Sequence, residues 1–107
     1  MSMGVVRIDA GGLIVGFDPG AEMMLGHSAD RVMGLPMAPL IIPEPLRAAH
    51  NDGMDRFLRT GEPFLIGRTI EITAQHANGS VLPVELTLTL ESEDPLVIAG
   101  LLRHLDA

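Results

Sequence analysis

Histidine has the widest chemical range of the residue types in this chain, because a neutral imidazole can ligate a metal, exchange a proton or accept a hydrogen bond. The four histidines are His27, His50, His76 and His104, and their spacing matches no metal-binding motif. Of the four, His50 differs in its surroundings, because the apolar residues near it recur at helical spacing. A single imidazole on an apolar helix face can ligate a metal, or it can bond a backbone carbonyl in a structural role.

The helix that should carry His50 runs from about Pro43 to Thr60. Prolines at 43 and 45 suit a first helical turn, and Gly61 suits a helix end. One face is predicted to be apolar and to look at a sheet. Its members recur at helical spacing: Leu46, Ala49, His50, Gly53, Met54 and Phe57.

A long β-hairpin is predicted after this helix, because the apolar period changes from 3.6 to two. Its strands should cover 70–75 and 84–91. A two-residue turn at Asn78-Gly79 would mix the two faces of the hairpin. A three-residue loop, Ala77 to Gly79, instead pairs Ile72 with Val84 and Ile70 with Leu86 on the face toward the helix.

The rest of the chain predicts short elements around this centre. Two strands, 5–8 and 13–17, flank a Gly11-Gly12 turn. Asp18 and Ser28 should cap helices ending at Leu25 and Met33, and Pro36 and Pro39 should keep the next segment irregular. With a last strand at 96–105, the order predicts an α+β fold with helices on one side of an antiparallel sheet.

Composition excludes several functions. The 107 residues fit one domain, the net charge is −7, and the seven basic residues are all scattered arginines, so we expect no binding to nucleic acid. No apolar run is long enough to span a membrane, which leads us to expect a cytoplasmic protein. Cysteine is absent, which excludes disulfides, cysteine-ligated zinc and covalent flavin adducts.

An enzyme is not expected. No serine stands in a nucleophile elbow, and Glu71, Glu85 and Glu91 occupy strand positions that should face solvent. The last strand has no alternating polar positions, so both its faces should be covered. Its second cover is either another copy of the chain, giving a homodimer through the outer sheet face, or a flanking segment outside these residues.

The order of several short motifs resembles the PAS family over nearly the whole chain. The motifs are Ile8-Asp9-Ala10-Gly11-Gly12-Leu13-Ile14, Phe17 to Glu22, Leu25 to Ser28, Val32 to Gly34, Thr60 to Glu62, Asn78-Gly79 and Leu82 to Glu85. The resemblance implies a five-stranded antiparallel sheet with helices over one face. It further implies a sensory or dimerising module, here residues 1–107, within a larger signalling protein whose effector domain lies outside this chain.

Within that family, the stretch from Pro43 to Pro83 is similar to haem-binding PAS domains of oxygen-sensing kinases. The resemblance implies that His50 is the axial ligand, that Leu65, Leu86 and Leu88 line the distal side, and that Arg56 lies near the propionates. Ile70 replaces a distal arginine that holds oxygen, so oxygen should bind weakly if haem is present. The alternatives are a different small ligand, or a dimerisation module without one.

Overall fold

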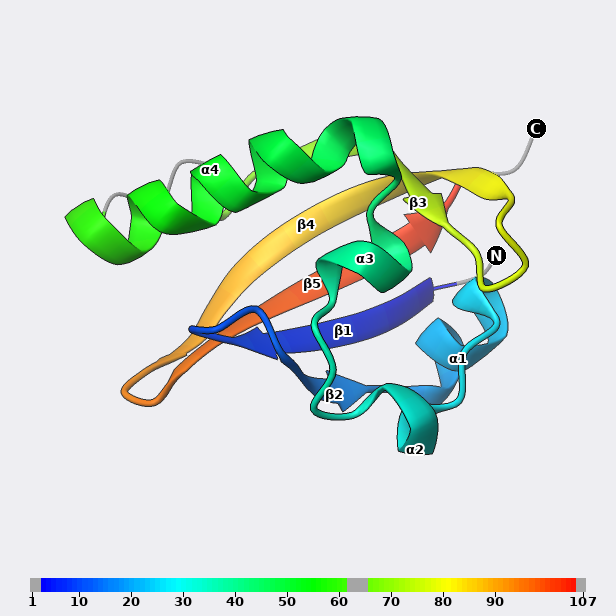
Figure 1. The fold of residues 1–107 in the computed structure, drawn as a ribbon, viewed down its shortest axis with the longest axis horizontal. Coiled ribbons are helices and arrows are strands. Elements are labelled where there is room, and N and C mark those ends of the chain that lie inside the picture. The colour runs from blue at the N-terminus through cyan, green and yellow to red at the C-terminus, as the bar shows by residue number, and fades with distance from the viewer. Residues whose placement is uncertain (1–2, 62–65, 106–107) are drawn as a thin grey trace.

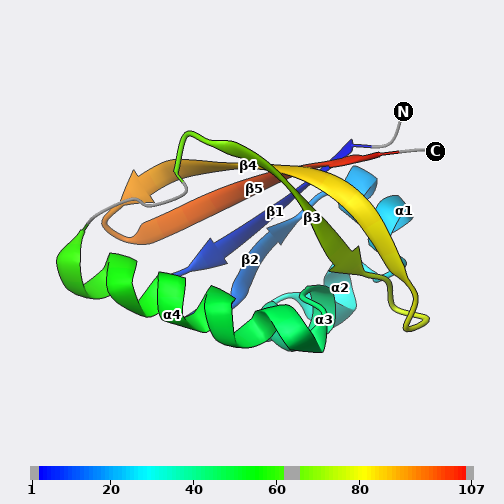
Figure 2. The same ribbon diagram turned by 90° about the horizontal axis from the view of Figure 1, so that it is seen from above.

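The computed structural model describes residues 3–61 and 66–105 and contains one five-stranded antiparallel sheet with strand order β2-β1-β5-β4-β3. Helices α3 and α4 lie over one face of this sheet (Figures 1 and 2). The α+β fold expected from the sequence is therefore confirmed. In chain order the elements are β1 (Met3–Asp9), β2 (Ile14–Phe17), α1 (Pro19–Leu25), α2 (Ala29–Val32), α3 (Ala38–Ile41), α4 (Glu44–Thr60), β3 (Thr69–Gln75), β4 (Val81–Glu93) and β5 (Leu96–His104).

The β3–β4 hairpin has the predicted register, with Ile70 opposite Leu86 and Ile72 opposite Val84. The N–H of His76 donates to the carbonyl oxygen of Ser80 at 2.8 Å, which closes the three-residue loop. Gly79 takes a φ of +90°, a conformation that glycine adopts without a steric penalty. The loop chemistry therefore fixes which side chains face the helices.

Asp18 joins the first strand to the first helix. Its Oδ1 accepts hydrogen bonds from the N–H of Ala21 at 2.8 Å, as a helix N-cap, and from the N–H of Val5 at 2.9 Å. The two elements approach so closely that a Cβ on Gly20 would collide with the backbone of Met3. One carboxylate thus holds α1 against the start of β1.

The buried core draws on every helix and strand except α4. Fully buried side chains come from both N-terminal strands, the three short helices and the C-terminal strands; they include Ile14, Leu25, Val32 and Val84, each at most 2% exposed. In α4 no residue is buried, and only Met54 and Phe57 pack partly against the core. The long helix therefore lies at the margin of the core.

Three expectations about the helices differ from the structure. The segment after Gly34 is not wholly irregular, because Ala38–Ile41 forms the one-turn helix α3 with Pro39 in its first turn, a position that proline tolerates. The predicted apolar face of α4 is also only partly inward, since Ala49 and Gly53 are exposed and Leu46 is 39% exposed. α2 ends one residue before the expected Met33.

Within the described residues no helix is long and apolar enough to cross a membrane.

Replacing Asp18 tests the junction between β1 and α1. Asp18→Ala removes one acceptor from two backbone N–H groups, and we expect the free energy of unfolding to fall by about 1–3 kcal/mol. Urea unfolding followed by circular dichroism measures this, since the chain has no tryptophan or tyrosine. Asp52→Ala, at an exposed position of α4, is the control and should change stability by less than about 0.5 kcal/mol. Equal effects of the two substitutions would contradict the assignment.

Candidate functional site

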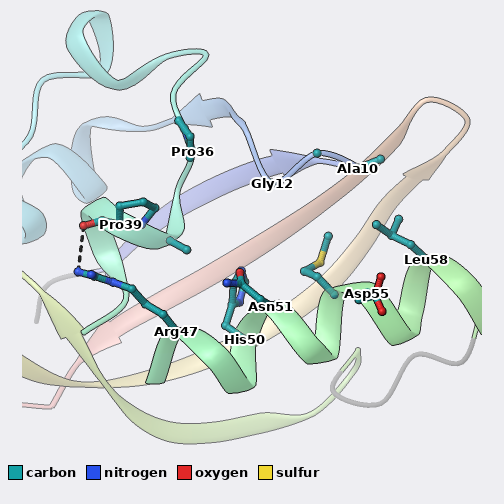
Figure 3. A pocket seen from close by; sticks show the side chains of 12 residues that line it. Ala10, Gly12, Pro36, Pro39, Arg47, His50, Asn51, Asp55 and Leu58 are labelled. Atoms are coloured by element: carbon teal, nitrogen blue, oxygen red, sulfur yellow. Dashed lines mark hydrogen bonds between the residues drawn. The ribbon is translucent and has the colours of Figure 1, made fainter. Parts of the chain in front are cut away.

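A pocket of about 430 Å³ lies between α4, α3 and the β1–β2 turn (Figure 3). The volume is within the range of small-molecule sites in proteins, about 300–1,000 Å³. Its wall combines charged, amide and imidazole groups with aliphatic ones. The lining residues are Ala10, Gly11 and Gly12 of the turn, Pro36, Ala38 and Pro39 around α3, and Arg47, His50, Asn51, Met54, Asp55 and Leu58 of α4.

His50 is a half-buried residue in the α4 wall of this pocket. Burial removes water from the imidazole and lowers the pKa of His50 below its usual 6.5, because the charged form loses more solvation than the neutral one. At neutral pH the ring therefore offers an uncharged nitrogen to the pocket. That state can accept a hydrogen bond or ligate a metal.

Arg47 fixes one edge of the pocket by bridging α4 to α3. Its Nε donates to the carbonyl oxygen of Ile42 at 2.8 Å, and its Nη2 donates to that of Pro39 at 3.2 Å, the bond drawn in Figure 3. Carbonyls at the end of a helix have no intrahelical partner, so a guanidinium there satisfies them and carries favourable charge. Arg47 thus sets the distance between α3 and the first turns of α4.

Asn51 and Asp55 follow Arg47 at helical spacing and also line the pocket. The carboxylate of Asp55 lies 3.8 Å from the guanidinium of Arg59, and both side chains are largely exposed. Such a pair contributes little to stability, and the Asp55 carboxylate remains part of the pocket lining. The site therefore presents a polar stripe on α4 beside the aliphatic carbons of Met54 and Leu58.

Of the residues that the sequence predicted for a haem site, only His50 lines this pocket. Ile70, Leu86 and Leu88 lie in the strands β3 and β4, where Leu86 and Leu88 pack against the core. Arg56 is exposed on α4. Leu65 is outside the described residues. The structure thus does not place the predicted distal wall in the same pocket as the imidazole.

Sequence reasoning missed Arg47, Asn51, Asp55 and the β1–β2 turn as parts of one site. The turn is about 40 residues from α4 in the chain, and only the sheet topology brings the two together. The sequence gives a weak indication for Arg47. This residue follows Pro-Leu at the start of an amphipathic helix, and from there its side chain can reach back to the preceding turn. Among residues 3–61 and 66–105, no group of three or more histidine or acidic side chains could hold a metal ion.

Comparison with known sequences identifies relatives of the chain. A family model described as the PAS fold matches residues 1–102. An uncharacterized protein of Azorhizobium caulinodans is 42% identical over 84 residues, which is 78% of this chain and 11% of that protein. The sensor protein FixL of Bradyrhizobium diazoefficiens is 28% identical over 102 residues, 94% of this chain and 20% of FixL. The chain therefore spans only a small part of the length of these relatives.

Solved structures share the fold at low sequence identity. A PAS domain from Colwellia psychrerythraea superimposes with a TM-score of 0.73 at 20% identity, covering 98% of this chain and 87% of that one. The PAS domain of the quorum-sensing receptor RpfR from Cronobacter turicensis, in complex with C12:0, gives a TM-score of 0.75 at 15% identity, covering 99% and 96%. At these identities the likeness concerns the fold alone.

The lowered pKa of His50 makes a prediction about acid stability. As the pH falls below about 6.5, the unfolded chain takes up a proton at this histidine before the folded chain does, so the free energy of unfolding should decrease. Above that pH the contribution is constant. We expect His50→Gln to reduce the loss of stability between pH 7.5 and 5.5, measured by urea unfolding. An NMR titration that gives His50 a midpoint of 6.5 or higher would contradict the prediction.

Proposed function

The chain belongs to the PAS family, and from this premise we propose that it is a sensory module that binds a small ligand in the pocket beside α4. The conformational change caused by ligand binding would then be transmitted to an effector domain elsewhere in the full-length protein. The family consists of sensory modules that are generally not catalytic on their own, and one relative is the sensor protein FixL. This membership supports the proposed role in sensing.

The observation that carries the proposal is the loose attachment of α4. This helix contributes no buried residue to the core, yet it forms most of the polar wall of a 430 Å³ pocket. A helix so placed can shift when the pocket fills, at little cost to the remaining core. Its 17 residues are long enough to carry a displacement from one end of the sheet toward the other.

The pocket supports an amphipathic ligand. Arg47, Asn51 and the neutral His50 offer donors and acceptors for a polar group, while Met54 and Leu58 offer apolar contact. The RpfR structures are described in complex with BDSF and with C12:0, so a domain of this fold can hold an aliphatic chain. We therefore propose a ligand with a polar head and an aliphatic or flat apolar body.

Haem with His50 as the axial ligand is the second candidate. The half-buried neutral imidazole favours it, because that is the donor a haem iron needs. The 430 Å³ pocket does not fit haem as the sequence predicted, since Ile70, Leu86 and Leu88 are not among its lining residues. This candidate therefore requires a larger space between α4 and the strands.

We also propose that the outer sheet face pairs with a second copy of the chain. On that face Ala99 is 7% exposed and Leu101 is 37% exposed, with Val5 directly opposite Leu101. Two ion pairs lie on the same face, Arg7 with Glu91 at 2.8 Å and Arg103 with Glu85 at 2.9 Å. Because each pair is internally neutral, two such faces can meet without strong charge repulsion.

Native mass spectrometry of the purified chain tests the ligand. We expect a co-purified small molecule, or stoichiometric uptake of an added one, that raises the thermal midpoint of unfolding. For the haem variant, addition of haem should give a Soret band that is lost in His50→Ala. The matched control, His104→Ala, should retain it. The absence of any band removes the haem candidate, and a chain that binds no small molecule contradicts the sensory proposal.

Sedimentation analysis tests the dimer. The chain should sediment as a dimer, and Leu101→Arg should shift it to a monomer because a charge would be buried in the apolar part of the interface. Met23→Arg is the control, since Met23 is 86% exposed on α1, and should leave the dimer intact. A monomeric wild type, or monomers from both variants, would refute this interface.

A further inference from the structure

The two edges of the sheet end differently. At the β2 edge the loop after α2 covers the strand: the N–H of Ile14 donates to the carbonyl oxygen of Leu35 at 2.9 Å, and the N–H of Gly34 donates to that of Ile14 at 2.8 Å. At the opposite edge, no strand among residues 3–61 and 66–105 pairs with the outer side of β3. The β3 edge can therefore accept another strand.

The backbone groups at this edge belong to alternate residues of β3. The bond from the N–H of His76 to the carbonyl oxygen of Ser80 sets the phase of the hairpin, so the even-numbered residues of β3 exchange their backbone bonds with β4. Thr73 lies opposite Pro83, which has no N–H and whose carbonyl oxygen accepts from the N–H of Leu105 at 2.9 Å. The N–H and C=O groups of the odd-numbered residues thus point away from β4.

β3 lacks the features by which natural proteins protect an edge strand. Its seven residues, TIEITAQ, include no proline and no lysine, and its register with β4 has no bulge. Glu71 is its one charged residue, and within the described part of the chain the Glu71 carboxylate forms no hydrogen bond or ion pair. On β5, Arg103 is bonded to Glu85 instead, at 2.9 Å. The middle of this edge therefore carries an acidic group that no ion pair neutralises.

An open groove of about 510 Å³ runs along the same edge. Its apolar lining comes from both faces of the sheet, with Leu46 and Ile72 on the face toward α4 and Pro83 and Leu105 on the other. Leu46 is 39% exposed and has surface left to bury. Successive side chains of an extended chain point to opposite faces. A groove with apolar contacts on both faces of one edge therefore fits an added β-strand.

We propose that β3 is the docking edge for an extended, basic segment of another protein, which adds a sixth strand to the sheet. The segment runs antiparallel to β3, as do all the strand pairs of this sheet. Its residue opposite Glu71 is lysine or arginine. The two residues before it are aliphatic; the one opposite Thr73 packs beside Pro83, and the one opposite Ile72 packs beside Leu46.

The charge of the edge distinguishes a basic segment from a second copy of the chain. A second copy would bring another Glu71 to the same edge, together with a further net charge of −7. A lysine or arginine opposite Glu71 forms a favourable cross-strand pair instead. The edge is also separate from the outer sheet face, so the proposal depends neither on the dimer nor on the ligand proposed above.

A capped peptide, acetyl-TVLIKVT-amide, tests the edge, because it has the length of β3 and places its lysine opposite Glu71. Binding is followed by NMR titration of the isotope-labelled chain and by amide hydrogen exchange. We expect the peptide to protect the outward N–H groups, those of Thr69, Glu71, Thr73 and Gln75, from exchange. The even-numbered N–H groups of β3, which are bonded to β4, should be protected without the peptide.

Two variants make the test specific. Thr73→Pro removes one outward N–H at a position where an edge strand tolerates proline, so the urea midpoint should be kept while the affinity for the peptide falls at least about tenfold. Glu71→Lys should weaken binding about fivefold, because like charges then face each other. A second peptide, with glutamate in place of the lysine, should bind Glu71→Lys more tightly than it binds the wild type. The control Glu93→Lys, exposed at the far end of β4, should alter neither affinity.

Protection of the outward N–H groups together with the exchange of charge preference supports the docking edge. A wild-type chain that does not bind the lysine peptide, or that binds it without protecting those groups, overturns the proposal and leaves the ligand-binding function standing. Equal affinities of the wild type and Glu71→Lys for both peptides also overturn it, even where Thr73→Pro is poorly folded. A wild-type dimer that Thr73→Pro converts to a monomer would assign the edge to a second copy and refute the basic partner.

Discussion

The contact between α4 and the sheet is weak, and the shape of the pocket beside this helix depends on it. A long amphipathic helix normally buries an apolar stripe when it packs on a sheet, and that burial fixes its position. Here only Met54 and Phe57 reach the core and neither is fully buried. The position of α4 is set instead at its first turns, where Arg47 binds two carbonyl oxygens of the α3 segment. The helix is anchored near one end and only lightly packed along its length.

This arrangement divides the molecule into a part that shares a continuous core and a part, α4, that packs only lightly against it. The strands, α1, α2 and α3 share a continuous core, and Asp18 ties the first helix to that core. The segment containing α4 adds little to it, so its local opening should require much less free energy than global unfolding. A displacement of α4 would therefore leave the sheet undisturbed.

The sequence predicts a structural element well when residues close together in the chain determine that element. The hairpin register follows from Asn78-Gly79 and from the alternation on both sides of it, and the cap at Asp18 follows from Asp-Pro; both were predicted correctly. The one-turn helix α3 was missed because two prolines read as breakers, although Pro39 sits where a first turn accepts it. The burial of the apolar face of α4 was overestimated. Helical periodicity shows which face is apolar, but it does not show how closely a sheet approaches that face.

The candidate site was harder to predict because its parts are brought together only by topology. His50 could be singled out from its own helix, whereas the wall opposite it comes from a glycine turn between the first two strands. Composition, however, did carry information about the interior. With three phenylalanines and no tryptophan or tyrosine, the core is built mainly from aliphatic and methionine side chains, whose ends change rotamer easily. A core of this kind can adjust to a shift of α4 more readily than an interlocked aromatic core could.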